Sequence, residues 1–499
     1  MAKAKCIMIQ GTMSGAGKSL LCTALCRIFA QDGWRVAPFK SQNMALNSCI
    51  TADGLEMGRA QAVQAQAAGC EPDVRMNPIL LKPSSDTGSQ VIVNGEVWGD
   101  YQAGDYFRKK TELIPHVLKA YNSLAEENDI LVIEGAGSPA EINLRENDIV
   151  NMGLAELVDA PVLLTGDIDR GGVFAQLYGT VALLKEEERK RVKGLIINKF
   201  RGDEAILRPG LVQLEELTGL PVVGVIPYTR VDIDDEDSLA PRLNEQQVHR
   251  PVDVAVIRLP HLSNFTDFSP LESHPALGVR YVEQASGLGV PDLIVLPGTK
   301  STMADLAWMR QNGLEAAVRK LAAAGTPVLG VCGGYQMLGQ TLADPEGVEQ
   351  AGEMRGMGLL PCETEFTRQK ARTRTGATVL AEPFAGATIQ GYEIHMGRTR
   401  RLAGQPFCRL ENGQEDGTVQ GNVFGTYLHG LFDEGSLTEA LAAWLLTRKG
   451  IALHQFRPQS HWDYQQSQYD LLADAVRVSL DLDTVYQAMG LENPNSRKK

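Results

Sequence analysis

The sequence predicts an α/β protein with two doubly wound, mostly parallel-sheet domains and a helical C-terminal extension. Short, uniformly apolar runs recur along the chain, and such runs are typical of strands buried on both faces of a parallel sheet. Amphipathic stretches of helical length separate them, which produces the strand and helix alternation of doubly wound folds. The length of 499 residues is about three times that of a typical domain, so more than one domain is expected.

We place the first domain at residues 1–234. Apolar runs near residues 6, 130, 161, 194 and 221 predict its strands. A helix follows the first run, because Leu21, Leu25 and Ile28 share one helical face and Gly33 suits the position where a helix ends. Ligands of such sheets bind at the carboxyl ends of the strands, so side chains at those ends are the candidates for function.

The second half repeats this pattern after a change of character. Residues 235–250 begin with an acidic run and then lack apolar periodicity, which predicts an interdomain linker. Apolar runs near residues 253, 292 and 327 predict a second, flavodoxin-like domain at residues 251–445. Ser436 and Glu439 have the spacing of a capping box and predict the start of its last helix. Residues 446–499 have helical patterning and form the predicted extension.

Composition and charge exclude several classes of protein. The chain has 48 Lys and Arg against 61 Asp and Glu, and this net charge of −13 argues against a nucleic-acid partner. No apolar run approaches the roughly 18 residues of a membrane span, and the N-terminus lacks a signal-peptide pattern. The eight cysteines show no CxxC pair, so a disulfide framework is not expected. We expect a cytoplasmic protein with no membrane partner.

A glycine-rich loop, GTMSGAGKS, lies between the first strand and the first helix. Backbone N–H groups of such a loop bind phosphate oxygens together with the positive end of the helix. Lys18 can reach a terminal phosphate and the Ser19 hydroxyl can ligate Mg²⁺. The loop is one residue longer than the standard Walker A pattern. The predicted nucleotide-binding residues are Gly11, Thr12, Gly15, Gly17, Lys18, Ser19 and Asn198.

Polar residues at later strand ends extend this site. Glu134 ends the apolar run ILVIE, where a carboxylate suits a metal ligand or a residue that holds water. Asp169 and Arg170 follow another strand, and two glycines after them allow close approach of a charged ligand. Asn198 ends a third strand, and its amide suits the edge of a purine, although a plain loop residue is an equally good interpretation.

The segments GTMSGAGKS, VIEGAGS and INKFRGD together resemble the dethiobiotin synthetase-like ATPases. Members of that family phosphorylate carboxylates with ATP and Mg²⁺. The resemblance implies that Lys18 and Ser19 serve the phosphates and the metal and that Glu134 ligates Mg²⁺. It also implies a further acidic metal ligand, for which Glu56 is favoured and Asp53 is the alternative.

Cys332 lies in the segment VLGVCGGYQ, directly after a buried strand and before a predicted helix. Small neighbours permit the sharp turn of a nucleophile elbow, and the helix N-terminus favours the thiolate. Backbone N–H groups at Gly333 and near Gly298 suit an oxyanion hole. A thiol nucleophile needs a base, and His429 and His395 both remain candidates on spacing alone.

The segments GVCGGYQ, LPGTKST and YLHG resemble the class I glutamine amidotransferases, in which a cysteine releases ammonia from glutamine. The resemblance implies that Cys332 is the nucleophile, His429 the base, and Gly298 part of the oxyanion hole. In one respect the sequence departs from the family pattern, because Leu431 stands where a triad glutamate is usual. Either another residue orients His429 or the cysteine and histidine act alone. Asp433 and Glu434 lie nearby in sequence.

A carboxylate-activating ATPase fused to a glutaminase describes an ATP-dependent amide synthetase. The segments FKSQNMALNS, DGLEMGRAQAVQAQAAG and GDIDRGGVFA resemble the cobyric acid synthase family, and the likeness covers residue 5 to about residue 435. That family amidates the b, d, e and g carboxylates of adenosylcobyrinic acid a,c-diamide in cobalamin biosynthesis, using glutamine and ATP. Our candidate substrate-binding residues, for the corrinoid or glutamine, are Lys40, Gln42, Asn43, Asp169, Arg170 and Gln336.

Three other functions compete with this interpretation. A cobyrinic acid a,c-diamide synthase would share both domains and differ in the carboxylates that it takes. An amide ligase of cell-wall lipid intermediates would usually carry its two activities on separate chains. A partitioning ATPase would use the phosphate loop as a nucleotide switch, but it would leave Cys332 and the whole second domain unexplained.

Overall fold

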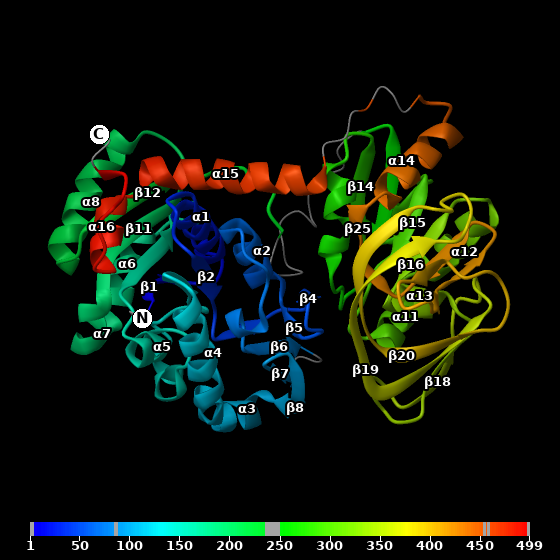
Figure 1. The fold of residues 1–499 in the computed structure, drawn as a ribbon, viewed down its shortest axis with the longest axis horizontal. Helices are drawn as coiled ribbons and strands as arrows, with labels where there is room; N and C mark the ends of the chain where they lie inside the picture. The colour runs from blue at the N-terminus through cyan, green and yellow to red at the C-terminus, as the bar shows by residue number, and fades with distance from the viewer. Residues whose placement is uncertain (1–3, 84–87, 235–249, 453–455, 457–459, 497–499) are drawn as a thin grey trace. The chain divides into compact units, whose positions relative to one another are not determined.

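The structure, a computed structural model, describes residues 4–83, 88–234, 250–452, 456 and 460–496 (Figure 1). The predicted linker falls almost entirely outside these described residues. The chain forms two compact units that do not follow simple chain order. Unit 1 comprises residues 1–44, 55–233 and 465–499, and unit 2 comprises residues 45–54 and 234–464.

The centre of unit 1 is a six-stranded parallel sheet that confirms the predicted α/β class. Its order, β12-β11-β10-β1-β9-β2, reverses direction of winding beside β1, as in doubly wound folds. All neighbouring strands are parallel. The strands are β1 (Lys5–Gly11), β2 (Val36–Phe39), β9 (Ile130–Glu134), β10 (Val162–Asp167), β11 (Val192–Phe200) and β12 (Val222–Pro227).

Helices accompany this sheet along the chain. They are α1 (Lys18–Gln31), α2 (Arg59–Ala68), α3 (Ala103–Lys109), α4 (Ile114–Glu127), α5 (Met152–Val158), α6 (Val173–Leu183), α7 (Glu186–Arg191) and α8 (Glu204–Thr218). A smaller sheet of order β3-β6-β7-β8 joins them, with β3 (Gln42–Met44), β6 (Ile79–Pro83), β7 (Gly88–Val93) and β8 (Glu96–Gln102). A further short strand is β5 (Glu56–Gly58).

The C-terminal extension is helical as predicted, and it completes the core of unit 1. Its helices are α15 (His461–Ser479) and α16 (Leu482–Ala488), and α15 lies beside α1 in Figure 1. Leu472 and Val476 are buried in the same apolar cluster as Phe29 of α1. Arg27 also pairs with Asp470 at 2.8 Å. The tail is therefore an integral layer of unit 1.

Unit 2 contains a second six-stranded sheet of order β14-β13-β15-β16-β24-β23, parallel except for its last pair. The strands are β13 (Val252–Ile257), β14 (Leu277–Val282), β15 (Leu293–Leu296), β16 (Val328–Val331), β23 (Thr418–Gln420) and β24 (Val423–Thr426). Its helices are α9 (Ser269–Ser273), α10 (Ala285–Leu288), α11 (Thr302–Gln311), α12 (Leu314–Ala323), α13 (Gly333–Leu338) and α14 (Leu437–Arg448).

A second, mostly antiparallel sheet in unit 2 was not predicted. Its order is β18-β17-β19-β20-β25, and β21 and β22 extend it from β19. The strands are β17 (Thr341–Asp344), β18 (Gly352–Arg355), β19 (Cys362–Val379), β20 (Thr388–Arg401), β21 (Cys408–Leu410), β22 (Glu415–Asp416) and β25 (Leu428–Gly435). Polar residues occur throughout β19 and β20, so their sequences lack the apolar runs that predict buried strands.

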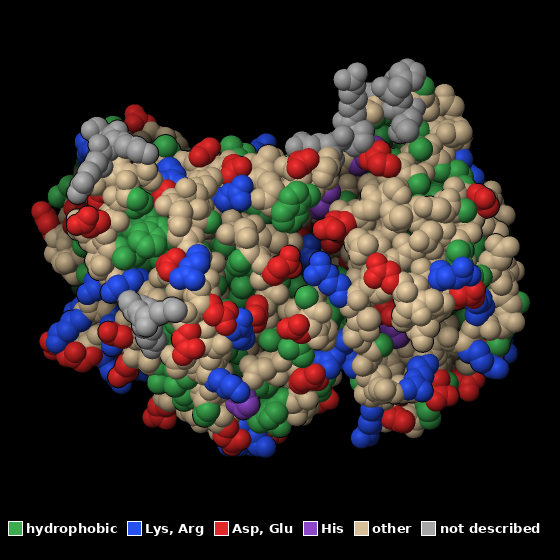
Figure 2. All heavy atoms as spheres, viewed as in Figure 1, with side chains coloured by type: hydrophobic (Ala, Val, Ile, Leu, Met, Phe, Trp, Pro, Cys, Tyr) green, Lys and Arg blue, Asp and Glu red, His purple; other side chains and the backbone are tan. Residues whose placement is uncertain are grey.

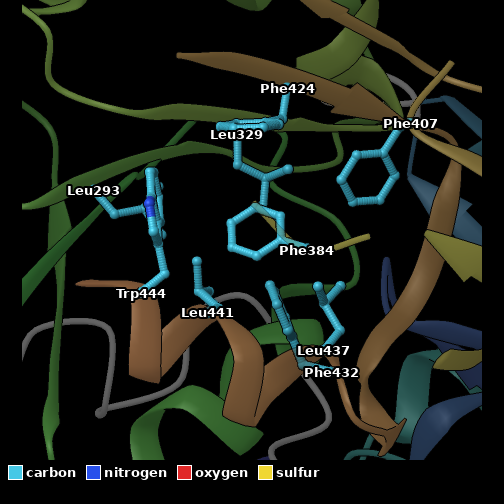
Figure 3. A pocket seen from close by; sticks show the side chains of 9 residues that line it. All are labelled: Leu293, Leu329, Phe384, Phe407, Phe424, Phe432, Leu437, Leu441 and Trp444. Carbon is cyan, nitrogen blue, oxygen red and sulfur yellow. The ribbon is translucent and has the colours of Figure 1, made fainter. Parts of the chain in front are cut away.

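Helix α14 closes the core of unit 2. Figure 3 shows its residues Leu437, Leu441 and Trp444 facing Leu293, Leu329, Phe384, Phe407, Phe424 and Phe432 around a cavity. The volume of this cavity is about 10 Å³. The helix begins after Ser436 as predicted, but the capping-box interpretation is wrong. The Ser436 hydroxyl accepts a hydrogen bond from the Thr388 N–H at 3.0 Å and makes no capping bond to its own helix.

Acidic and basic side chains are interspersed over each unit on the face shown in Figure 2. The net charge of −13 is thus not gathered into one acidic patch on that face.

Candidate functional site

The phosphate loop runs from β1 to α1 and has the backbone that its glycines permit. Gly15 and Gly17 have φ values of 75° and 92°, a region that L-residues rarely adopt. A Cβ on Gly17 would also collide with the carboxamide of Asn198. The Asn198 Nδ2 donates to the Ala16 carbonyl at 2.9 Å. Asn198 therefore braces the loop from the end of β11, and the purine contact suggested by sequence stays a prediction.

Lys18 begins α1 and its side chain is 7% exposed. Its ammonium donates to the carbonyls of Met13 at 3.1 Å and Gly137 at 3.0 Å, so it spans the mouth of the loop. Thr12 is oriented by its hydroxyl, which donates to Gln176 Oε1 at 3.1 Å. The cation at the loop is the group that a transferred phosphate requires.

Ser19 and Glu134 lie together, as the predicted metal site requires. The Ser19 hydroxyl donates to Glu134 Oε1 at 2.9 Å, and Glu134 is 1% exposed at the end of β9. Lys40 donates to the same carboxylate oxygen at 2.9 Å. Gln64 donates from Nε2 to Glu134 Oε2 at 2.5 Å, while its own fully buried Oε1 has no partner among the described atoms. The cluster thus combines the buried Lys40–Glu134 ion pair with a Gln64 oxygen of the kind that Mg²⁺ prefers.

The other predicted metal ligands have contacts of their own. Glu56 pairs with Lys82 at 2.7 Å, with both side chains buried. Asp53 is exposed and folds with unit 2. Within the described residues, no group of three Asp, Glu, His or Cys side chains could hold a metal ion. Hydroxyl and carboxylate oxygens suit Mg²⁺, which usually takes few protein ligands and leaves its other positions to phosphates and water.

The loop after β10 presents ion pairs at the same edge of the sheet. Lys199 donates to Asp167 Oδ2 at 2.8 Å and to the Gly15 carbonyl at 2.7 Å, which ties β11 to the phosphate loop. Arg170 lies 3.8 Å from Asp167 with most of its side chain exposed, and Asp169 pairs with Arg201 at 3.2 Å. Asp169 and Arg170 thus remain accessible, as a substrate-binding role requires.

Gln42 and Asn43 lie on β3 of the smaller sheet. Tyr106 donates from its hydroxyl to Gln42 Oε1 at 2.5 Å. Asn43 is 3% exposed and donates to Gln61 Oε1 at 3.3 Å. The structure therefore holds both amides by specific contacts, with Asn43 more deeply buried than a docking surface suggests.

Cys332 occupies a strained turn between β16 and α13. Its φ is 51° and its ψ is −109°, a backbone conformation that non-glycine residues adopt at a cost of about 1–3 kcal/mol. A Cβ on Gly334 would overlap the Leu296 carbonyl, so the turn can approach the neighbouring strand only with glycine there. This is the geometry of a nucleophile elbow.

His429 is held between Cys332 and an aspartate. Its Nδ1 donates to Asp267 Oδ2 at 2.6 Å, with both side chains at most 3% exposed, and Cys332 is close enough to interact with it electrostatically. Burial lowers the pKa of His429, but the Asp267 carboxylate and Cys332 raise it more, to about 10. At neutral pH the imidazolium places a positive charge and a proton donor beside Cys332.

The alternative base, His395, faces elsewhere. Its ring stacks on Tyr427 with centroids 3.7 Å apart, and its Nδ1 lies 2.7 Å from the Gly397 carbonyl. Of the two candidate histidines, the geometry therefore favours His429 as the base.

Gly298 and Gly333 flank the same site. A Cβ on Gly298 would lie 2.9 Å from the His429 ring, and one on Gly333 would lie 3.1 Å from the Thr299 backbone nitrogen. Gln336 is 3% exposed, accepts from Thr302 at 3.0 Å and donates to Tyr427 at 3.1 Å. The predicted oxyanion glycines thus border the catalytic pair, while the Gln336 amide is already engaged on both sides.

Comparison with known proteins agrees with two joined activities. Residues 7–239 match the CobQ/CobB/MinD/ParA nucleotide binding domain, and residues 253–437 match the CobB/CobQ-like glutamine amidotransferase domain. A cobyric acid synthase of Ruminiclostridium cellulolyticum is 56% identical over 99% of both chains. Those of Photorhabdus laumondii and Salmonella typhimurium are 52% and 50% identical, each over 97% of this chain and 98% of the relative.

The chain belongs to the cobyric acid synthase family. Identity at this level along the whole chain covers both sites, so the resemblance found in the sequence is confirmed. None of the helices in the described part of the chain combines the length and apolar character of a membrane span.

In this member of the cobyric acid synthase family, Asp267 is the candidate functional residue that sequence reasoning missed. It lies in the short helix Phe265–Phe268, 162 positions before His429, and it also accepts from the Gly430 N–H at 2.8 Å. Leu431, at the usual position of the triad glutamate, is fully buried in the apolar core. The available signal was an acidic residue between two phenylalanines, shortly after the first strand of unit 2.

Proposed function

We propose that the chain amidates the b, d, e and g carboxylates of adenosylcobyrinic acid a,c-diamide, with glutamine as nitrogen donor and one ATP for each amide. The observation that carries this proposal is the presence, in one chain, of a phosphate loop with Lys18 and a Cys332–His429–Asp267 site. Full-length similarity to cobyric acid synthases supports it over an a,c-diamide synthase. The amidotransferase half argues against a partitioning ATPase.

At the glutaminase site, the Cys332 thiolate attacks the carboxamide carbon of glutamine. Backbone N–H groups at Gly298 and Gly333 stabilise the oxyanion that forms. The His429 imidazolium donates its proton to the leaving nitrogen, and ammonia departs as the carbon forms a thioester with Cys332. His429 then takes a proton from water, which attacks the thioester and releases glutamate and the free thiolate.

At the phosphate loop, an oxygen of the corrinoid carboxylate attacks the γ-phosphorus of ATP and ADP leaves. Lys18 stabilises the charge on the transferred phosphoryl group. Ammonia then attacks the acyl phosphate and phosphate leaves, which completes the amide. Lys40, Asp169 and Arg170 are our proposed substrate contacts here, and Lys40 offers the positive charge that a carboxylate substrate needs.

Mg²⁺ fits this site through Ser19 and Glu134, with the unpartnered Gln64 Oε1 as a further hard oxygen. When bound, the ion would neutralise charge on the phosphates. ATP and glutamine are both cytoplasmic metabolites, and we place the reaction in that compartment.

The test supplies ATP, Mg²⁺ and the corrinoid with either glutamine or ammonium chloride, and counts added amides by mass spectrometry. Cys332→Ala should abolish glutamine use and keep the ammonia-dependent reaction, whereas Lys18→Ala should abolish both. Cys362→Ala, which removes another buried free thiol of unit 2, is the matched control and should keep both. Absence of corrinoid-dependent ATP turnover in the wild-type protein would refute the proposal.

A further inference from the structure

A short segment of the nucleotide-binding half folds as part of the glutaminase unit. The chain leaves unit 1 after Met44, the last residue of β3, and returns to it at Leu55. We call residues 45–54 the inserted segment. Its strand β4 (Ser48–Ile50) is buried along its whole length. At both ends the inserted segment continues directly into the chain that carries the phosphate loop.

Ser48, Asn264 and Tyr392 form a closed ring of hydrogen bonds. The Ser48 N–H donates to Asn264 Oδ1 at 3.2 Å, and the Ser48 carbonyl accepts from the Tyr392 hydroxyl at 3.0 Å. The ring closes because Asn264 Nδ2 donates to the Tyr392 oxygen at 3.2 Å. All three residues are buried, so each unmade bond would leave a polar group without water and cost about 1–3 kcal/mol.

Asn264 leads directly to Asp267. It adopts a left-handed conformation with φ 51° and ψ 39° and precedes the short helix Phe265–Phe268. Its carbonyl accepts from the Asp267 N–H at 3.0 Å. The residue that fixes the Ser48 N–H therefore also begins the turn that carries the acid of the triad.

Tyr392 leads directly to His429. The two residues are cross-strand partners on β20 and β25, and their rings stack with centroids 5.5 Å apart and planes 22° apart. A Cβ on the adjacent Gly391 would overlap the His429 carbonyl, so the two strands are in close contact here. A shift of the tyrosine ring would therefore move the imidazole.

The third link runs through Ile50. Ile50, Tyr392 and Ile394 form a small buried apolar cluster. The Cys332 Sγ lies 3.6 Å from the Ile394 carbonyl oxygen. The inserted segment thus touches one neighbour of each triad residue, by two hydrogen bonds and one apolar contact.

We propose that Tyr392 and Asn264 are positioning residues through which the inserted segment holds Cys332, His429 and Asp267 in their working arrangement. At both ends, the inserted segment is joined through the backbone to the nucleotide-binding half. This inference rests on the proposed release of ammonia at Cys332.

The experiment is Tyr392→Phe in the full-length protein. The variant keeps the ring and its stacking but removes the hydroxyl that joins Ser48 to Asn264. Because small displacements of catalytic groups cost up to about 100-fold, we expect kcat for glutamate release to fall about 10-fold to 100-fold. KM for glutamine and the ammonia-dependent amidation rate should stay within about twofold of wild type, since neither glutamine binding nor the phosphate loop is altered.

A second variant and a matched control keep the test independent of a folding defect. Asn264→Gly tolerates the left-handed backbone while it removes the carboxamide, and it should give the same loss in kcat. Tyr281→Phe deletes a hydroxyl that donates to Glu272 at 2.7 Å elsewhere in unit 2, and it should behave as wild type.

Two results would overturn the inference. The first is glutamate release at the wild-type rate by both Tyr392→Phe and Asn264→Gly. The second is an equal fall in the glutamine-dependent and ammonia-dependent rates, which would indicate general damage. Failure of the wild-type protein to release glutamate would instead refute the proposed function, and the same assay reports it before any variant is compared.

Discussion

Asp267 is held from two sides, and this determines what its replacement by asparagine would do. Oδ2 accepts from His429 Nδ1 at 2.6 Å, and Oδ1 accepts from the Gly430 N–H at 2.8 Å. In Asp267→Asn, the amide oxygen must stay on Gly430, because an amide nitrogen there would face another donor. The NH₂ group then faces His429 Nδ1, which can meet it only as an acceptor.

This arrangement places the imidazole proton on Nε2, the nitrogen that should serve Cys332. The carboxylate that helps raise the pKa of His429 to about 10 is also lost. The imidazole is then less readily protonated, so it no longer provides a positive charge beside the Cys332 sulfur. The comparable change in a serine triad costs about 10⁴ in kcat. A thiol is more acidic than a hydroxyl and depends less on its base, so we expect a loss of about 10²–10³, or about 3–4 kcal/mol.

The assay is steady-state glutamate release from glutamine by the full-length variant, with ammonium chloride as nitrogen donor in a parallel reaction. Amidation from ammonia should be unchanged, because the substitution leaves the phosphate loop untouched. Asp253→Asn is the matched control, since it removes a carboxylate of unit 2 that pairs with Arg280 at 2.7 Å outside the triad. Glutamine hydrolysis by Asp267→Asn within about tenfold of wild type would refute the orienting role of Asp267.

Two further predictions concern stability. Burial raises the pKa of Glu349 to about 7 from 4.5, so the folded chain keeps a proton that the unfolded chain loses. Stability relative to Glu349→Gln should therefore fall by about 3 kcal/mol as pH rises from about 4.5 to 7, and thermal melts across that range should show it; parallel curves would contradict it. Leu441→Ala enlarges the cavity in Figure 3 and should cost about 3–5 kcal/mol in urea unfolding, against at most about 0.5 kcal/mol for the exposed Val290→Ala.

The parts of the fold that the sequence predicted are those with strong local patterns. The runs near residues 6, 130 and 161 form β1, β9 and β10. A strand that is buried on both faces needs apolar residues at nearly every position, so its sequence is a short apolar run. The strands β19 and β20 were missed because their exposed positions carry polar and charged residues. Their pairing depends on partners distant in sequence, and no single segment reports it.

The candidate site divides in the same way. Gly17, Lys18, Ser19 and Cys332 stand in motifs where a few consecutive residues form the whole feature, because a loop or elbow takes its backbone from its own glycines. Glu56 was expected beside Ser19 and Glu134, and the structure adds an ion pair with Lys82 that the sequence did not predict. The choice between acids at separate strand ends depends on side-chain packing, which spacing along the chain does not encode.

By itself, the sequence determined the α/β class and the resemblance to the cobyric acid synthase family, and it predicted the phosphate loop and Cys332 as the nucleophile. Only the tertiary structure decided that Asp267 orients His429, that α15 and α16 complete unit 1, and that residues 45–54 fold with unit 2. The physical reason is the separation along the chain between the residues that interact. Turns and apolar periodicity arise from neighbouring residues, whereas a buried ion pair or a shared core joins residues that only the folded chain brings within bonding distance.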